Sequence, residues 1–424
     1  MRLHHVLLAA AILAITLPAR AQQQPFFLHD GDTVVMYGDS ITEQRFYTLW
    51  VESYVATRFP QRNITFFPEG VGGDRVTGGG AGPIDTRIPR DILAHKPSVV
   101  TIMLGMNDGS YQPLTPTIES TYSQGYEHIL ATLEKSLPGV RITLLGPSPY
   151  DEVTRPEMFP GGYNGTLIHF ADLDAQLARQ HHQSFVDFNA PFVAALKRGA
   201  AIDSLATQML LPDRVHPEQT AHLLMAQALL KGWNAPALVS SATIDAAKSA
   251  VTASANAHIS NLIATPSALT WTQLDDALPL PVDFSSTGNH FLSQISDIID
   301  QLDQQPLTVT GLAPGLYELT IDDSSVGKFT DLELTHGINL ALHDTPMRWQ
   351  AFTVFWSLRD REAAEYLHMH LLVNQANSGV SREQTAAGLA DYIQSQQTDI
   401  HALAQPKPHA FKLALIPTQK PPTN

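Results

Sequence analysis

The chain has 424 residues, of which 44% are hydrophobic, no cysteine, and a formal net charge of −15. This hydrophobic content excludes a disordered protein, and the length predicts two domains or one domain with a large extension. The negative charge argues against nucleic acid and anionic lipid surfaces as partners, and the lack of cysteine excludes disulfides and a lipid anchor on cysteine.

Residues 1–21 have the features of a secretory signal peptide. Arg2 precedes an apolar run from Val6 to Leu17, and Ala19-Arg20-Ala21 provides a small-x-small cleavage site. The run is too short to span a bilayer, so we predict no stable membrane anchor. We expect cleavage near Ala21 and export to the periplasm or the extracellular space. The alternative is a buried core helix.

Between Asp32 and Trp233, short apolar segments alternate with segments of helical periodicity. This alternation predicts parallel strands joined by right-handed helical crossovers. For residues 22–236 we therefore expect a three-layer α/β/α sandwich with a parallel five-stranded sheet. The expected strands are Val34–Tyr37, Ile64–Phe67, Val99–Leu104, Arg141–Leu145 and Phe185–Phe188, and the expected helices are Phe46–Phe59, Ile84–Ala94, Ile118–Leu137, Phe170–His182 and Pro217–Lys231.

The composition changes after Ala235-Pro236, and residues 237–405 are predicted to form a mostly helical α+β extension with a β-hairpin. No Ser/Gly- or Pro-rich linker lies near residue 236, and the tryptophans are scattered rather than aligned as a sugar-binding platform. We therefore expect the extension to pack on the first domain, and residues 406–424 to form a flexible tail. The expected helices are Thr243–Ile263, Phe291–Leu302, Arg348–Val373 and Arg382–Leu403, and the hairpin pairs Leu307–Thr310 with Leu316–Ile321.

The first predicted strand ends at Gly38-Asp39-Ser40. A serine at this point lies at the carboxyl edge of the sheet, where ligands bind in open α/β sheets, and close to the amino terminus of the next helix. A serine is a poor nucleophile unless a base accepts its proton and donors stabilise the oxyanion. The rest of the chain should therefore supply a base, an acid that orients it, and oxyanion donors.

Three further motifs supply these groups. Gly72-Gly73-Asp74 follows the second strand, where a glycine can expose a backbone N–H to a ligand, and Asn107 follows the third strand with an amide donor. Asp213 lies three residues before His216, so one short turn can deliver an imidazole together with the carboxylate that fixes its tautomer. Each motif alone is better explained by a turn, a helix cap or a surface histidine, but four in order at strand ends and helix starts indicate one site.

This set resembles the SGNH hydrolases, also called GDSL-type esterases, over about residues 30–235. The matching blocks are Gly38-Asp39-Ser40, the segment ending in Gly73, Gly105-Met106-Asn107-Asp108, and Asp213-Arg214-Val215-His216. The resemblance implies a flavodoxin-like sandwich in which Ser40 is the nucleophile, His216 the base and Asp213 its orienting acid. It also implies three oxyanion donors, which are Ser40 N–H, Gly73 N–H and the Asn107 side chain.

One departure from the family is visible, because Pro68-Glu69-Gly70 stands where the family often has an asparagine. The choice between Gly72 and Gly73 as oxyanion donor therefore stays open, and we favour Gly73 because it directly precedes Asp74. An α/β-hydrolase is disfavoured, since the serine motif lacks the second glycine of a nucleophile elbow. No cluster has metal-ligand spacing, so we predict neither a metal nor a cofactor.

Candidate substrate contacts are Asp39, next to the serine, and Tyr150, Asp151 and Tyr163 on the Pro- and Gly-rich loop of residues 146–166. The alternative is that these loop residues are held in local turns. We predict a secreted serine esterase that acts on a small-molecule or carbohydrate ester, with acetylated glycans favoured. The alternative function is an inactive relative that binds carbohydrate or cell-wall material through its C-terminal region.

Overall fold

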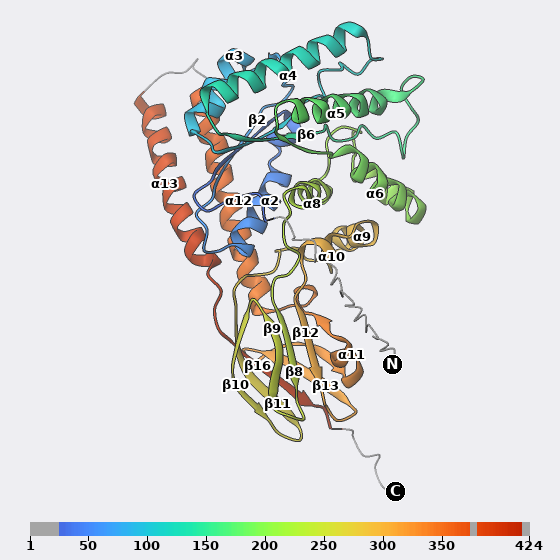
Figure 1. The fold of residues 1–424 in the computed structure, drawn as a ribbon, viewed down its shortest axis with the longest axis vertical. Helices are drawn as coiled ribbons and strands as arrows, with labels where there is room; N and C mark the ends of the chain where they lie inside the picture. The colour runs from blue at the N-terminus through green and yellow to red at the C-terminus, as the bar shows by residue number, and fades with distance from the viewer. Residues whose placement is uncertain (1–24, 374–379, 418–424) are drawn as a thin grey trace, which may run out of the picture.

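The computed structural model describes residues 25–373 and 380–417, so the predicted signal peptide lies outside the described residues. A parallel sheet of five strands, in the order β2-β1-β5-β6-β7, is the centre of the N-terminal domain (Figure 1). This confirms the predicted sheet. Its strands are β1 (Thr33–Gly38), β2 (Thr65–Gly70), β5 (Val99–Met103), β6 (Arg141–Leu145) and β7 (Ser184–Val186).

Helices cover both faces of this sheet, which gives the predicted three layers (Figure 1). Helices α4 (Pro116–Ser136) and α5 (Gly162–Gln180) lie on one face, and α2 (Phe46–Arg58) and α8 (His222–Gly232) pack together on the other. The remaining elements are α1 (Ser40–Glu43), the short strands β3 (Gly78–Gly79) and β4 (Gly82–Pro83), α3 (Ile84–Arg87), η1 (Ile88–Ile92), η2 (Leu93–His95), α6 (Asn189–Ile202) and α7 (Ser204–Gln208).

Two helical predictions need correction. The helix expected over Ile84–Ala94 is divided into α3, a π turn and a 3₁₀ turn. Pro89 lies at the start of the π turn, where its missing N–H removes a regular helical hydrogen bond. Helices α6 and α7 were not expected at all, and α5 begins at Gly162, so Tyr163 lies on a helix rather than on the preceding loop.

The extension contains a β-sandwich with an apolar core of its own. One sheet has the order β10-β11-β16-β13-β14 and the other β15-β12-β8-β9. Leu307, Leu319 and Leu413 are fully buried among the side chains of this core. The strands are β8 (Ser241–Asp245), β9 (Ala250–Ala255), β10 (Ala257–Ala264), β11 (Ala268–Asp275), β12 (Pro306–Thr310), β13 (Leu316–Ile321), β14 (Ser324–Thr330), β15 (Ile338–Asn339) and β16 (His409–Leu415).

The prediction of a helix over Thr243–Ile263 is wrong, because this segment forms β8, β9 and β10. Alanine favours a helix intrinsically, but pairing of β8 with both β9 and β12 overrides that preference. Ser249, Asn256 and Asn261 have positive φ values of 48°, 52° and 54°, which no α-helix contains.

The expected hairpin and tail also differ from the structure. Strands β12 and β13 lie in different sheets, and the hairpin of this region pairs β13 with β14 instead. The loose tail is wrong for His409–Leu415, because β16 lies between β11 and β13. Alternate residues His409, Phe411 and Leu413 point into the core, a period of two that the sequence contained. Residues 418–424 lie outside the described part.

Two long helices are inserted between the last turns of the sandwich and β16. Helices α12 (Pro346–Val373) and α13 (Val380–Ala404) form a hairpin, here called the helical hairpin, which runs along the outer side of α2 (Figure 1). Phe355 of α12 stacks on Trp50 of α2 with ring centroids 4.6 Å apart. Val354, Phe355, Leu358, Ile400 and Ala404 therefore belong to the apolar core of the N-terminal domain.

Of the three tryptophans in the extension, one lies apart from the others and two lie together on α12. Trp271 is buried in the sandwich and stacks on Phe411. Trp349 and Trp356, however, lie on one side of α12 and flank Phe352, with ring centroids 5.8 Å and 5.6 Å from it. Their spacing by three and four residues is the helical repeat that aligns side chains on one face.

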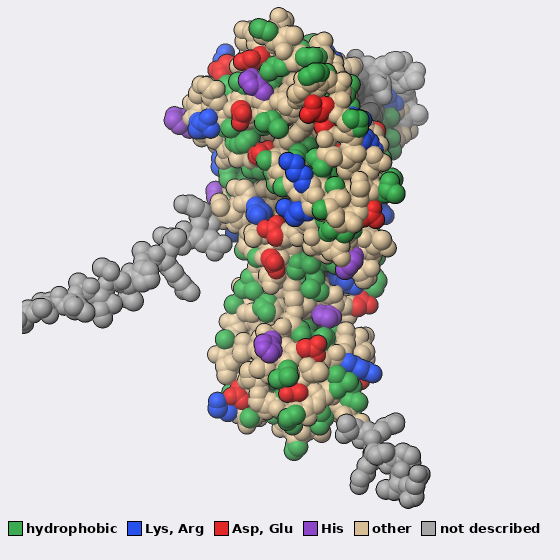
Figure 2. Space-filling view, turned by 90° about the vertical axis from the view of Figure 1, so that its right-hand side faces the viewer, with side chains coloured by type: hydrophobic (Ala, Val, Ile, Leu, Met, Phe, Trp, Pro, Cys, Tyr) green, Lys and Arg blue, Asp and Glu red, His purple; other side chains and the backbone are tan. Residues whose placement is uncertain are grey.

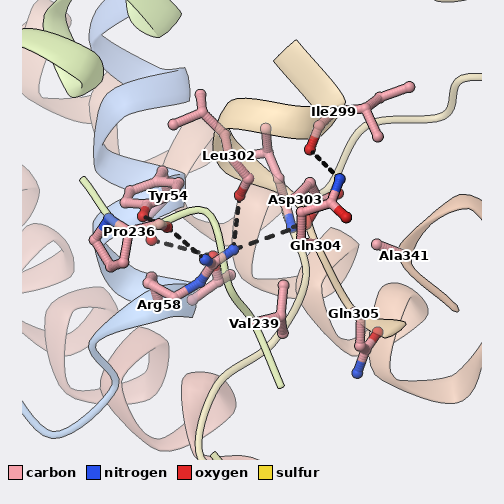
Figure 3. Close-up of polar contacts among 12 residues, drawn as sticks. Tyr54, Arg58, Pro236, Val239, Ile299, Leu302, Asp303, Gln304, Gln305 and Ala341 are labelled. Atoms are coloured by element: carbon pink, nitrogen blue, oxygen red, sulfur yellow. Dashed lines mark hydrogen bonds and ion pairs between the residues drawn. The ribbon is translucent and has the colours of Figure 1, made fainter. Parts of the chain in front are cut away.

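The sandwich joins the rest of the molecule at a narrower waist (Figure 2). Arg58, at the end of α2, donates hydrogen bonds of 2.8 Å to the carbonyls of Pro236 and Leu302, and its guanidinium lies 3.8 Å from the Asp303 carboxylate (Figure 3). Tyr54 also donates to the Pro236 carbonyl. Next to this junction, α9 (Thr287–Ile295) and α10 (Ile298–Leu302) pack on the N-terminal domain, while α11 (Asp331–His336) and η3 (Leu340–Leu342) accompany the sandwich.

Candidate active site

Ser40 is the first residue of α1, and only Asp39 separates it from the end of strand β1. Asp39 caps the amino terminus of this helix by accepting a 3.0 Å hydrogen bond from the Ile41 N–H. Gly38 is required because a Cβ atom there would lie 2.1 Å from Thr42 Oγ1 and 2.8 Å from the Met103 carbonyl oxygen. The close approach of strand and helix presents Ser40 at the carboxyl edge of the sheet.

His216 and Asp213 come together with Ser40, as the motifs predict. Ser40 Oγ lies 2.8 Å from His216 Nε2, and His216 Nδ1 lies 2.7 Å from Asp213 Oδ2. The other oxygen of Asp213 accepts the backbone N–H groups of Val215 and His216 at 3.0 Å and 2.8 Å. One carboxylate therefore shapes the turn and orients the imidazole at the same time.

Electrostatics favour an ionised Asp213. Burial raises the pKa of this carboxyl, but the hydrogen bonds from His216 and Val215 outweigh it and hold the pKa below the usual value of 3.8. An ionised carboxylate on Nδ1 keeps the Nδ1 proton in place and leaves Nε2 free to accept a proton from the serine hydroxyl. The arrangement can thus carry out acyl transfer to serine.

The Gly72–Gly73 loop passes beside Ser40. A Cβ atom on Gly72 would lie 3.9 Å from Ser40 Cβ. Gly73 has φ +73° and open space around it, so its backbone conformation, not crowding, is the reason for glycine. The loop is anchored by Asp74, which accepts a hydrogen bond from Tyr37 at 2.7 Å and pairs with Arg87 at 2.5 Å.

Asn107 lies between the serine motif and this loop. Its Nδ2 donates to the Asp74 carbonyl at 3.1 Å and to Asp39 Oδ2 at 3.4 Å. The second hydrogen bond is long, so a substrate oxygen that accepts a shorter one can replace it. Asp108 ties the two loops together, because its carboxylate accepts the N–H groups of Val76 and Gly105, each at 3.0 Å.

Asp39 is a buried residue with a structural role at the helix cap. Burial raises the pKa of Asp39 to about 7, and the carboxylates of Asp108 and Asp74 add to the rise while the Ile41 N–H opposes it. Only 1% of Asp39 is exposed, so it offers almost no surface to a ligand. Its direct bonds to the helix and to Asn107 instead suit an indirect part in positioning both.

The candidate contacts on the loop after β6 have structural partners. Asp151 is fully buried and accepts hydrogen bonds from Val153, Thr154 and Arg155. Tyr163 is fully buried too and donates to the Met106 carbonyl at 2.6 Å. Neither exposes surface to a ligand. The contacts of Asp151 agree with the alternative of a local turn, whereas Tyr163 is held on helix α5 by a contact that is distant in sequence.

Tyr150 is also largely buried, with Arg214 above its ring at 5.7 Å. The loop braces the turn that carries the imidazole, since Arg155 donates to the carbonyls of Leu211 and Pro212 at 2.8 Å and 2.7 Å. The Asp151 N–H also donates to the Arg214 carbonyl. The loop therefore reaches the site by supporting Asp213 and His216.

Three nearby residues were missed by the sequence analysis. Tyr111 has a positive φ of 55°, and its ring lies tilted against that of Tyr163 with the ring centroids 4.9 Å apart. Nothing in the sequence around Tyr111 predicts this. Glu43 ends the serine-bearing helix, and its carboxylate receives a hydrogen bond of 3.3 Å from Tyr366 of α12. Glu43 could have been noticed as the last residue of the serine turn, but its partner is more than three hundred residues away.

Within residues 25–373 and 380–417, no group of three or more His, Cys, Asp or Glu side chains is placed to hold a metal ion. The helices of that part of the chain also include none with the length and apolar character that a bilayer span requires.

Comparisons with known proteins agree with this geometry. Residues 36–224 match the GDSL-like lipase/acylhydrolase family. The acetylxylan esterase of Geobacillus stearothermophilus is 27% identical over 219 residues, which cover 47% of this chain and 93% of that protein.

Among solved structures, BT4096, a gut microbial diltiazem-metabolizing enzyme, superimposes with a TM-score of 0.81 at 24% identity, over 93% of this chain and 99% of its own. It shares the fold of both the hydrolase-like domain and the extension. The sequence matches carry the family assignment: this chain is a carboxylic ester hydrolase whose N-terminal domain belongs to the GDSL-like lipase/acylhydrolase family, the SGNH hydrolases.

Proposed function

We propose that the chain is an exported serine esterase that works through an acyl-Ser40 intermediate. The observation that carries the proposal is the continuous hydrogen-bonded series from Ser40 Oγ to His216 Nε2, at 2.8 Å, and from His216 Nδ1 to Asp213, at 2.7 Å. Export rests on the signal-like residues 1–21.

In this mechanism His216 accepts the hydroxyl proton as Ser40 Oγ attacks the ester carbonyl. Asp213 stabilises the imidazolium that forms. The same imidazolium then donates the proton to the departing alcohol, which leaves the acyl group on Ser40. Water, deprotonated by His216, attacks that acyl group, and the acid is released with Ser40 restored.

The negative charge on the tetrahedral oxygen needs donors that are already in place. We assign this role to the backbone N–H groups of Ser40 and Gly73 and to the Asn107 amide. Gly73 is supported by its left-handed backbone and open surroundings, and Asn107 by its contacts with both neighbouring motifs. An oxyanion replaces the 3.4 Å bond from Asn107 to Asp39 with a shorter, charge-assisted one.

For the substrate we propose acetyl esters of carbohydrates. The support is the similarity to an acetylxylan esterase over most of that protein's length. On the face of the molecule shown in Figure 2, acidic and basic side chains are interspersed and form no large patch of a single charge. Acetylated xylan, acetylated pectin and a series of p-nitrophenyl esters of increasing acyl length rank the acyl groups and alcohols directly.

The decisive test replaces Ser40 by Ala. Turnover of p-nitrophenyl acetate should be lost while the thermal unfolding curve stays close to that of the wild type, because Ser40 contributes little packing. A serine-directed phosphonate should label the wild type only. Undiminished turnover by Ser40→Ala removes this residue from the mechanism, and a wild type without any ester turnover favours an inactive, carbohydrate-binding relative.

Asn107→Ala tests the oxyanion site. Loss of one such donor costs about 3 kcal/mol, or roughly a hundredfold in kcat, with little change in KM because the bond strengthens only in the transition state. Steady-state kinetics on the same ester measure both constants. A change confined to KM contradicts the assignment.

A further inference from the structure

The extension reaches the site through one face of α12. Tyr366 donates a 3.3 Å hydrogen bond to Glu43 Oε1, and the Arg45 guanidinium lies 4.3 Å from the centre of the Tyr366 ring. Arg45 also donates to the Glu362 carbonyl of α12. Glu43, the last residue of the serine helix, and Arg45, two residues further along the chain, are thus held by the C-terminal region.

The inner side of the serine helix α1 packs closely against the ends of two strands. A Cβ atom on Gly70, at the end of β2, would lie 2.2 Å from the Glu43 N atom and 2.5 Å from the Thr42 carbonyl carbon. Gly38, at the end of β1, packs closely against the Thr42 side chain. The four residues of α1 are therefore enclosed by strands on the inner side and by α12 on the outer side.

Glu43 also adjoins the loop that carries the proposed oxyanion donor. Its Oε2 atom lies 2.9 Å from the position of a Cβ on Gly72, while Oε1 receives the Tyr366 hydroxyl. Gly72 directly precedes Gly73. A displacement of the Glu43 carboxylate consequently changes the space available to this loop next to Ser40.

Arg45 is the corner between α1 and α2. It has a left-handed φ of 58°, which is uncommon for a residue with a side chain and persists only where the surroundings hold it. The ring of Tyr366 and the Glu362 carbonyl are contacts that hold it from outside. Burial and the Glu43 carboxylate raise the pKa of Tyr366, so its hydroxyl stays protonated and remains a donor at neutral pH.

We propose that Tyr366, in the C-terminal extension, is a positioning residue of the esterase site: it holds Glu43 and Arg45 and thereby sets the placement of Ser40 relative to the Gly72–Gly73 loop. This inference rests on the proposed roles of Ser40 and Gly73. It gives the helical hairpin a part in catalysis in addition to its packing on α2.

Tyr366→Phe is the main test, since it removes only the hydroxyl and keeps the ring against Arg45. A lost hydrogen bond to a charged group should lower kcat on p-nitrophenyl acetate roughly threefold to tenfold, with KM and Tm almost unchanged. Tyr392→Phe is the matched control, because Tyr392 lies on α13 with its side chain 42% exposed. It should behave as the wild type.

Two variants of Glu43 complete the design. Glu43→Gln keeps an acceptor for Tyr366 and should lose less activity than Glu43→Ala. Tyr366→Phe combined with Glu43→Ala should be no slower than Glu43→Ala alone, since both changes break one contact. A structural role alone lowers Tm and leaves kcat intact at temperatures well below Tm.

The outcomes separate this inference from the proposed mechanism. If Ser40→Ala keeps its turnover, the mechanism itself fails. If the phosphonate labels Ser40 in the wild type and labels Tyr366→Phe at the same rate, with the same kcat, then Ser40 stands and the positioning role of Tyr366 is overturned. A loss in Tyr392→Phe equal to that in Tyr366→Phe also overturns it.

Discussion

The helical hairpin and the β-sandwich follow one another in the same extension, yet they relate to the hydrolase domain in opposite ways. In the described part of the hairpin, Val354, Phe355 and Leu358 complete the core of the hydrolase domain, whereas Met347 and Ala351 at the start of α12 belong to the core of the sandwich. The sandwich buries Leu319 and Leu413 in a separate core. A chain segment adjacent in sequence can therefore belong energetically to a distant domain.

Charged side chains show the same difference. At the hairpin, Arg361 is buried and pairs with Glu52 of α2 at 2.6 Å and with Glu365 at 3.3 Å. In the sandwich, ion pairs such as Lys248 with Asp245 are largely at the surface, where they contribute little to stability. The buried pair specifies how α12 sits on α2, because removal of one partner would leave an uncompensated charge.

The largest expected effect comes from deletion of the hairpin. The ends of α12 and α13 are adjacent, since Gln350 donates to the carbonyls of Leu403 and Gln405 at 2.7 Å, so a short Gly-Ser linker can join Thr345 to Gln405. The deletion should uncover Trp50 and its neighbours and give an insoluble or inactive protein. Soluble yield and esterase activity measure this. A soluble deletion variant with wild-type kinetics would show that the hairpin is dispensable for folding and activity, and would contradict its assignment to the hydrolase domain.

The next largest effect is expected from two matched core truncations, one in the hairpin and one in the sandwich, which should differ in their effect on kcat. Phe355→Ala and Leu319→Ala each cost about 2–5 kcal/mol of stability, because both remove fully packed apolar atoms. At temperatures where both variants are folded, Phe355→Ala should lower kcat, since it loosens the helix that holds Tyr366, while Leu319→Ala should retain it. Thermal unfolding and ester kinetics test the pair. Equal kcat values in the two variants contradict the division.

The smallest effect concerns pH at the junction between the regions. Burial raises the pKa of Asp303 from 3.8 to about 7, against the opposing charge of Arg58. Between these pH values the folded protein keeps a proton that the unfolded chain has released, so the contribution of Asp303 to the free energy of unfolding falls as pH rises from about 4 to about 7.

Asp303→Asn should therefore flatten the decline of Tm with rising pH, by roughly 2–4 °C between pH 5 and pH 7. Asp300→Asn, an exposed change on α10, is the control and should leave the slope as it is. An unchanged slope in Asp303→Asn contradicts a protonated Asp303 at the junction. Calorimetry at several pH values makes the measurement.

Much of the hydrolase domain could be predicted because its signals are local. The three inner strands β1, β5 and β6 are largely apolar runs, as burial on both faces of the sheet requires. Asp213 and His216 come together through one turn, so their distance in sequence already predicts their contact. Ser40 follows β1 and Asn107 follows β5. These strands are parallel neighbours, so their carboxyl ends, and the two residues, lie side by side at one edge of the sheet.

The sequence by itself determined the sheet, the serine turn and the Asp213–His216 pair. The signals for these features are the hydrophobic pattern of a strand, the residues that favour a turn and a short spacing in sequence, and each of them is contained within a few residues. Only the tertiary structure decided the conformation of Thr243–Ile263, where strand pairing overrode the helix preference of alanine, and that of His409–Leu415, which completes a sheet whose first strand starts at Ala257. The contact of Tyr366 with Glu43 was likewise decided by packing of α12 on α2. Such contacts join residues far apart in the chain, and no local propensity encodes which surface a helix will cover.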